Sequence, residues 1–184
     1  SLKRSNAPRR GAIKSVLVVD DSKLQRKILT LALKRWGFDV FEAASGQEAL
    51  DLATVQRPDL VLSDWMMPGM SGLELCQRFR EMDGEEYCYF ILLTSKSEKE
   101  EVARGLDSGA DDFLTKPVDN NELRARITAG ERLVEMQRSM AQANRALSDT
   151  LAELQQLYDN IDSDLKEAKK LQQSLVRERF RALP

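Results

Sequence analysis

Five polar residues that follow short apolar stretches could do chemistry together: Asp20, Asp21, Asp64, Thr94 and Lys116. Three carboxylates in one place repel each other and need a cation, and oxygen ligands of this kind suit Mg²⁺. A hydroxyl and an ammonium group beside them could hold the oxygens of a phosphoryl group. These residue types therefore describe a phosphoryl-transfer site with Asp64 as the nucleophile. Taken singly, each acid could instead cap a helix or start a turn, and Lys116 could be a surface charge.

The apolar pattern predicts elements that would bring these residues together. Short apolar runs predict strands over residues 16–19, 39–43, 60–63, 89–93 and 113–115. Helical spacing follows each of the first four runs, and the fourth helix is expected around 102–106, ending at Gly109. This alternation predicts an α/β fold, a doubly wound five-stranded parallel sheet of the flavodoxin-like order 2-1-3-4-5. Asp20, Asp21 and Asp64 would then face each other at the carboxyl edge of neighbouring strands.

The chain outside this pattern divides into a tail and a long helix. Residues 1–14 are basic and lack apolar periodicity, so we expect a mobile tail before a domain over 15–127. Residues 128–184 carry a strict seven-residue repeat, formed by Leu133, Met140, Leu147, Leu154, Ile161, Ala168 and Leu175. This repeat predicts a parallel two-stranded coiled coil that makes the chain a homodimer, with polar Asn144 at an adjacent core position. A helix packed back on its own domain is the alternative.

Composition excludes several classes of function. The net charge of −2 favours neither nucleic acid nor a polyanionic tail, and no apolar run is long enough to span a membrane. The absence of histidine excludes a Ser-His-Asp triad, histidine-based metal sites and a phosphohistidine on this chain. Cys76 and Cys88 lack metal-site spacing, and no signal-peptide pattern precedes them, so we expect reduced thiols in the cytoplasm.

The motifs around these residues resemble the receiver domain of bacterial two-component response regulators. The resemblance rests on Asp20-Asp21, Asp64 with Met66-Met67-Pro68, Gly72, Thr94-Ser95 and Lys116-Pro117. It covers about residues 15–127 and implies that a histidine kinase or phosphotransfer protein donates a phosphoryl group to Asp64.

The same resemblance implies a role for each site residue. Asp21, Asp64 and the Met66 backbone carbonyl would bind Mg²⁺ directly, with Asp20 acting through water. Thr94 and Lys116 would contact the phosphoryl oxygens. Phe113 matches the aromatic position that switches together with Thr94. That position is often tyrosine, so a hydrogen bond from its hydroxyl is absent here.

The output of such a receiver is less defined by the sequence. No DNA-reading helix follows the domain. Residues 168–175 resemble the segment leading into metal-dependent protein serine phosphatases of the bacterial stress-response type, which implies such a domain beyond Pro184; more coiled coil is the plain alternative. A diguanylate cyclase output and a stand-alone dimeric adaptor also remain open. The chain itself would catalyse only its own phosphorylation and dephosphorylation. The competing class, a phosphatase with Asp64 as nucleophile, would want a second acid where Met66 stands.

Overall fold

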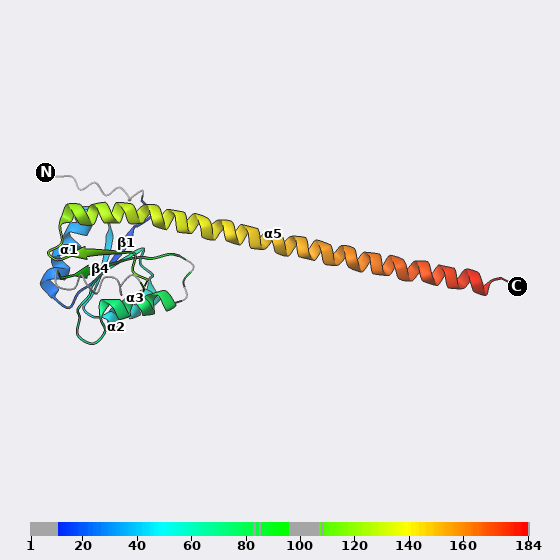
Figure 1. The fold of residues 1–184 in the computed structure, drawn as a ribbon, viewed down its shortest axis with the longest axis horizontal. Helices are drawn as coiled ribbons and strands as arrows, with labels where there is room; N and C mark the ends of the chain where they lie inside the picture. The colour runs from blue at the N-terminus through cyan, green and yellow to red at the C-terminus, as the bar shows by residue number, and fades with distance from the viewer. Residues whose placement is uncertain (1–10, 83, 85, 96–106, 108, 184) are drawn as a thin grey trace. The chain divides into compact units, whose positions relative to one another are not determined.

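The described part of the protein, a computed structural model, comprises residues 11–82, 84, 86–95, 107 and 109–183. Five parallel strands form one sheet there, in the order β2-β1-β3-β4-β5 (Figure 1). The strands are β1 (Ser15–Val19), β2 (Asp39–Ala43), β3 (Leu60–Asp64), β4 (Tyr89–Thr94) and β5 (Asp112–Thr115). This confirms the predicted flavodoxin-like sheet and its order.

The burial of each strand follows its place in the sheet. All residues of β3 and β4 are buried, because these central strands are covered on both faces. β2 and β5 lie at the edges and are partly exposed. The continuous apolar runs therefore form the central strands β3 and β4, and the runs that mix apolar and polar residues form the edge strands β2 and β5.

Four helices are described: α1 (Lys23–Arg35), α2 (Gly46–Val55), α3 (Gly72–Glu81) and α5 (Asn120–Arg181). Serine caps begin the first three, since the side chains of Ser22, Ser45 and Ser71 each accept a hydrogen bond from the backbone N–H three residues later. At the start of α2, the Glu48 side chain also accepts a hydrogen bond from the N–H of Ala44, one residue before the cap. The helix expected around 102–106 lies outside the described residues.

Two apolar clusters cover the two faces of the sheet. On one face, α1 contributes Leu29 and Leu33, and the first turns of α5 contribute Leu123, Ile127 and Val134. On the other face, α2 and α3 contribute the residues Ala49, Ala53, Leu75, Cys76 and Phe79. Figure 1 shows the same division, with α1 and α5 on one side of the sheet and α2 and α3 on the other. Cys76 and Cys88 are both buried and form no disulfide.

The chain divides into two compact units, Ser1–Arg138 and Ser139–Pro184. α5 begins at Asn120, where Asp119 Oδ1 accepts hydrogen bonds from the N–H groups of Asn121 and Glu122. Its first turns pack on the sheet as far as Val134, which is fully buried, because the apolar spacing there matches the sheet surface. The segment that packs with the domain thus extends past residue 127.

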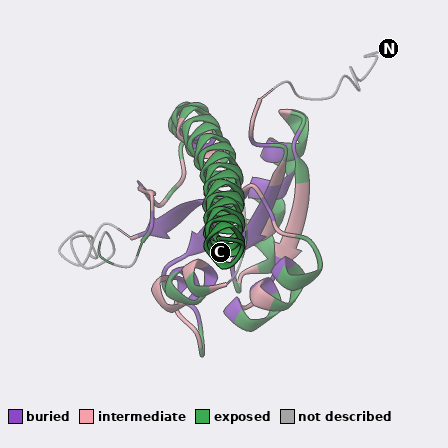
Figure 2. Cartoon of the chain, turned by 90° about the vertical axis from the view of Figure 1, so that its right-hand side faces the viewer, coloured by how far each residue is buried: buried purple, intermediate pink, exposed green. Residues whose placement is uncertain are grey.

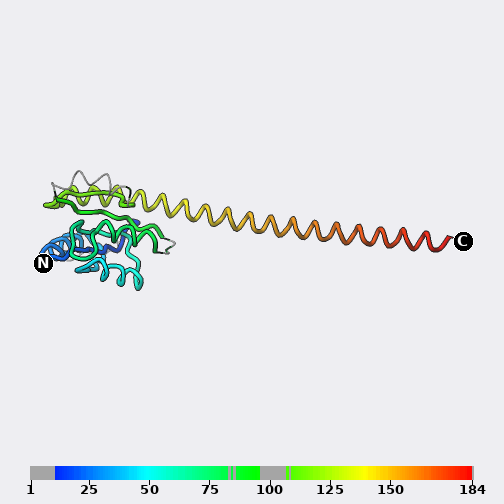
Figure 3. The backbone as a smooth tube through the Cα atoms, turned by 60° about the horizontal axis from the view of Figure 1, so that its bottom comes forward, coloured from blue at the N-terminus to red at the C-terminus, as the bar shows by residue number. Residues whose placement is uncertain are grey.

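The second unit is helix alone. Residues 142–183 are all exposed in the single chain, as the colouring in Figure 2 indicates. Figure 3 traces the backbone of α5 as one uninterrupted helix through this region. No helix among the described residues is long and apolar enough to cross a membrane.

The expected basic tail ends earlier than the sequence suggested. Ile13 is fully buried and belongs to the cluster that α1 and α5 cover. The prediction that residues 1–14 form a mobile tail is therefore wrong at Ile13. A single apolar residue produces no periodic pattern in the sequence, so its burial could not be predicted from periodicity. Residues 1–10 lie outside the described part.

Candidate functional site

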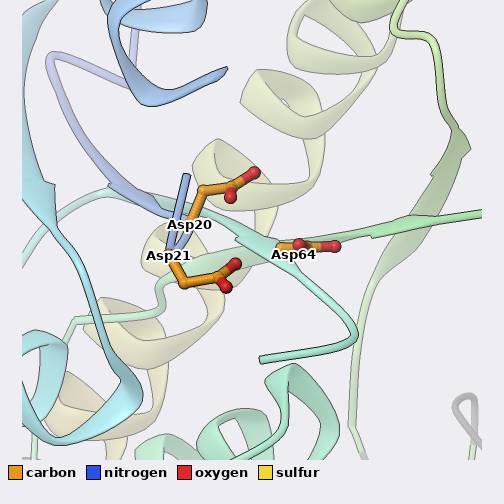
Figure 4. Close-up of side chains that lie close together, drawn as sticks. All are labelled: Asp20, Asp21 and Asp64. Atoms are coloured by element: carbon orange, nitrogen blue, oxygen red, sulfur yellow. The ribbon is translucent and has the colours of Figure 1, made fainter. Parts of the chain in front are cut away.

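Three carboxylates meet at the carboxyl edge of the sheet. β1 and β3 are neighbours, and Val19 lies opposite Ser63, so Asp20, directly after β1, and Asp64, the last residue of β3, emerge side by side. One carboxylate oxygen from each of Asp20, Asp21 and Asp64 lies within 4.8 Å of the others. Figure 4 shows the three side chains directed into one space. Asp20 and Asp64 are buried, whereas Asp21 is exposed.

Lys116 connects two of these carboxylates. Its Nζ atom lies 2.9 Å from Asp64 Oδ1 and 3.4 Å from Asp20 Oδ2. The Lys116 backbone N–H donates to the Thr94 carbonyl at 2.7 Å, which ties the end of β5 to the end of β4. Lys116, which follows the edge strand β5, is thereby brought close to Asp20 and Asp64 at the ends of β1 and β3.

The charge on Asp64 is unfavourable in this environment. Burial raises the pKa of the Asp64 carboxyl group above its ordinary value, and the charges of Asp20 and Asp21 act in the same direction. Lys116 lowers the pKa by a hydrogen bond and by its charge, yet the net direction is upward. Lys116 therefore does not fully offset the effects of burial and of the two neighbouring acids, and a further cation near Asp64 would favour its ionised form.

The turn after β3 depends on a glycine. The Gly72 N–H donates to the Trp65 carbonyl at 2.8 Å, which closes the turn that carries Met66, Met67 and Pro68. A Cβ atom on Gly72 would come within 2.1 Å of the Asp64 carbonyl oxygen. Only a residue without a side chain permits this approach, so Gly72 holds the backbone of Asp64 in place.

Two further residues position Asp20. The Ser22 N–H donates to Asp20 Oδ1 at 2.8 Å, and Arg26 Nη1 donates to the Asp20 carbonyl at 2.6 Å. Sequence reasoning assigned neither residue to the site. The position of Arg26 one turn into α1 was the available signal, because its side chain can reach back over the helix N-terminus.

Thr94, Phe113 and Met66, the other residues predicted for the site, lie on β4, on β5 and in the turn after β3. Thr94 is buried at the end of β4, one residue beyond Leu93, the partner of Asp64 in the sheet. Phe113 lies on β5, and its ring centroid is 6.0 Å from that of Trp65, the residue after Asp64. The Met66 side chain is exposed. No interaction of the Thr94 hydroxyl or the Met66 carbonyl is recorded among the described residues.

The residues present fit a bound Mg²⁺. The donor set consists of carboxylate oxygens, which this hard cation prefers, and Asp21 leaves an exposed side on which water could complete an octahedral shell. Burial raises the pKa of Asp64, and the charges of Asp20 and Asp21 add to this, so a cation bound there would favour the ionised carboxylate.

The comparison with protein families identifies the class. The sequence model of the response regulator receiver domain matches residues 16–128, which is more than half of the chain. The chain therefore belongs to the response regulator receiver family, as the resemblance implied, and the family is that of two-component signalling.

Similar proteins agree with this assignment. The phosphate regulon transcriptional regulatory protein PhoB of Pseudomonas aeruginosa is 40% identical over 116 residues, which are 63% of this chain and 51% of that protein. This chain spans about half the length of the curated relatives it matches.

Solved structures show the same fold. A putative response regulator from Chloroflexus aurantiacus superposes with a TM-score of 0.62 at 32% identity, covering 65% of this chain and 98% of that one. A probable two-component system response regulator/GGDEF domain protein gives a TM-score of 0.62 at 32% identity, covering 66% of this chain and 50% of that one.

We predict that Mg²⁺ stabilises the protein through the three carboxylates. A ligand at ten times its Kd adds about 1.4 kcal/mol to the free energy of unfolding, a melting-temperature rise of a few degrees. Thermal unfolding with increasing MgCl₂ should show this rise for the wild type and lose it in Asp21→Ala. Asp51→Ala, which removes an exposed acid from α2, is the matched control. An equal rise in Asp21→Ala would place the cation elsewhere.

Proposed function

We propose that this receiver accepts a phosphoryl group on Asp64 from a histidine kinase or a histidine phosphotransfer protein. These 184 residues contain no histidine, so they supply no phosphohistidine of their own. In the reaction a carboxylate oxygen of Asp64 forms a bond to phosphorus while the P–N bond of the donor's phosphohistidine breaks. The products are an aspartyl phosphate on this chain and an unmodified histidine on the donor.

The observation that carries this proposal is the meeting of Asp64 with Lys116 and two further acids at one sheet edge. Mg²⁺, held by Asp21, Asp64 and the Met66 carbonyl, with Asp20 acting through water, would neutralise charge on the phosphoryl oxygens. Lys116 can exchange its contact with Asp64 for one with a phosphoryl oxygen, and the Thr94 hydroxyl can donate to another.

Thr94 and Phe113 form the proposed switch. A Thr94 hydroxyl drawn to the phosphoryl group would vacate space beside β5, and Phe113 could turn toward it. Phe113 contacts Trp65 and has no hydroxyl, so its two positions would differ by packing rather than by a hydrogen bond. Trp65 fluorescence should therefore respond to both the metal and the phosphoryl group.

We predict that Asp64 is the sole phosphorylated residue. Asp64→Asn should abolish labelling by acetyl phosphate and Mg²⁺, because the amide is not a nucleophile for this reaction. Lys116→Ala should slow the labelling, since the ammonium no longer neutralises the transferred group. Intact-protein mass spectrometry measures the added mass, and Asp51→Asn serves as the control. Unchanged labelling of Asp64→Asn would refute the assignment.

We propose that the donor docks on α1. Three large apolar side chains at helical spacing are exposed there, with 71% of Leu24, 58% of Ile28 and 56% of Leu31 accessible. α1 begins two residues after Asp21 and carries basic residues but no acidic ones. An apolar helix face with acidic residues around it would complement this surface and bring the donor's histidine to the site.

We predict that Ile28→Asp slows phosphotransfer from a phosphorylated protein donor by at least about tenfold, as expected for a lost apolar anchor. Labelling by acetyl phosphate should stay unchanged, because a small donor needs no docking surface. Val55→Asp places the same charge at an exposed apolar position on α2 and is the control. Equal slowing with both kinds of donor would show that the substitution damages the site rather than the docking surface.

We propose that residues of the second unit pair with a second copy of this chain in a parallel coiled coil. Leu147, Leu151, Leu154, Tyr158, Ile161 and Leu165 are each more than half exposed in the single chain and recur with alternating spacings of four and three residues. A single helix with such a stripe buries it only by association. With Asn144 and Leu151 at the first core position of the heptad, paired Asn144 side chains would fix the register.

Flanking residues support the parallel orientation. In a parallel pair, a residue on one side of the seam faces the residue five positions later in the partner helix. Asp164 would face Lys169 of the other copy with opposite charge, and Leu171 would face Val176 with matching apolar character.

The output is proposed on the resemblance of residues 168–175 to the segment before protein serine phosphatases. The similarity to response regulator/GGDEF domain proteins keeps a diguanylate cyclase output as the second candidate, and a stand-alone dimeric adaptor is the third. The names of the curated relatives refer to whole chains of which this one matches about half, so they do not assign a DNA-binding output here. Sequencing the gene beyond Pro184 would decide among these outputs.

We predict a sedimentation mass of about twice the 20.9 kDa of one chain at tens of micromolar protein. Leu147→Asp combined with Leu154→Asp should halve the mass, because charges in the seam cannot be buried unpaired. Gln142→Asp with Gln156→Asp adds the same charges on the outer face of the helix and should leave the dimer intact. A monomeric wild type would end the proposal.

A further inference from the structure

An acid lies at each end of β3, with Asp59 directly before the strand and Asp64 as its last residue. Each acid is paired with a basic residue of the segment from Lys116 to Arg138. At the carboxyl end, Asp64 pairs with Lys116 at 2.9 Å. At the amino end, Asp59 Oδ1 accepts a hydrogen bond from Arg138 Nη2 at 2.7 Å. The stretch from Lys116 to Arg138 is therefore tied to both ends of one central strand.

Asp59 is firmly connected to the sheet. Its Oδ2 atom accepts from the N–H groups of Lys14 and Ser15 at 2.8 and 3.1 Å, and its carbonyl accepts from the Tyr89 N–H at 2.9 Å. Burial acts to raise the pKa of Asp59, but these donors and Arg138 outweigh it, so the pKa lies below its ordinary value. A single acid thus joins the starts of β1, β3 and β4 to α5.

Arg138 is the last residue of the first unit. Besides Asp59, its guanidinium donates to the Ala12 carbonyl at 3.0 Å and lies 3.5 Å from Glu86. Its buried Nε atom has no hydrogen-bond partner among the described residues. The guanidinium thus makes a short contact with Asp59 but leaves one of its own donors unpaired. Such a contact can hold a helix and still open at moderate cost.

The stretch of α5 beyond Arg138 needs this support. Gln137 and Asn144 occupy two successive positions of one core register of the proposed coiled coil around Arg138, and both are polar, with Met140 as the apolar core residue between them. Met140 is thus the one apolar residue at a core position between Arg138 and Leu147, and without an anchor this weakly packed stretch would fray.

We propose that the Asp59–Arg138 pair anchors the far end of the Lys116–Arg138 segment, so that a change at the Lys116–Asp64 pair reaches the coiled coil as movement of α5. The inference rests on the proposed phosphorylation of Asp64. An aspartyl phosphate carries more negative charge than a carboxylate and draws Lys116 to a new position. With the far end fixed, the displacement becomes tilt or rotation of the helix; with that end free, it is absorbed by fraying. Arg138 is thus a positioning residue remote from the chemistry.

Hydrogen exchange of the full-length chain tests this anchor. Amides of residues 139–147 are followed with and without acetyl phosphate plus Mg²⁺, while mass spectrometry reports the extent of phosphorylation. In the wild type, phosphorylation should change exchange in this stretch. In Arg138→Gln and in Asp59→Asn, exchange should be about tenfold faster, as expected for a lost charged hydrogen bond. It should also become insensitive to phosphorylation, which a merely structural role would not cause.

Controls separate the possible failures. Arg132→Gln removes the same charge from an exposed position of α5 and should behave as the wild type. The double variant should exchange no faster than either single variant, because both remove one interaction. Unchanged phosphorylation kinetics in Arg138→Gln would show an intact site.

The inference would be overturned if amide exchange of residues 139–147 in the wild type did not change on phosphorylation. It would also be overturned if Arg138→Gln kept the full wild-type change. Neither result would contradict the proposed phosphorylation of Asp64. Absence of phosphorylation in the wild type would overturn the proposed function, and transmission through α5 with it.

Discussion

The contact between Lys116 and the acids after β1 and β3 is the interaction on which the site depends. The Asp64 carboxylate is disfavoured first by burial and then by the charges of Asp20 and Asp21, and Lys116 offsets these effects only in part, so the pKa of Asp64 lies above its ordinary value. That remaining imbalance makes the site receptive to a cation. The parallel sheet holds the charges together because its packed core compensates for the unfavourable edge.

Sheet order converts distant sequence positions into one site. Asp20 and Asp64 are 44 residues apart in the chain, yet they become neighbours because β1 and β3 pair directly. Lys116 arrives from an edge strand through its backbone contact with Thr94. The chemistry therefore depends on strand order, and any topology that separated β1 from β3 would separate the acids as well.

The strands and this convergence could be predicted because both follow from apolar runs and from the general geometry of parallel sheets. The support around Asp20 was missed, because Ser22 acts through its backbone N–H, which no residue pattern reveals, and the position of Arg26 one turn into α1 was the only signal for its contact with the Asp20 carbonyl. Burial of Ile13 and the length of α5 that packs on the sheet were missed for a similar reason. At Leu133 the seven-residue repeat and the spacing that fits the sheet overlap, because Leu133 also packs against the receiver core.

That overlap has a consequence for signalling. A helix shared between a receiver and a coiled coil cannot fully satisfy both, since each partner requires a different set of faces as the periods of 3.6 and 3.5 residues diverge. Gly130 and Val134 follow the sheet, with Gly130 close against the Tyr89 ring, whereas Leu147 and Leu154 follow the seam. Polar Gln137 and Asn144 lie between these sets, with Met140 the one apolar core residue between them, so apolar contacts are few in this stretch. Small changes in free energy at the receiver have their largest structural effect in such a stretch, because few competing contacts must be broken there.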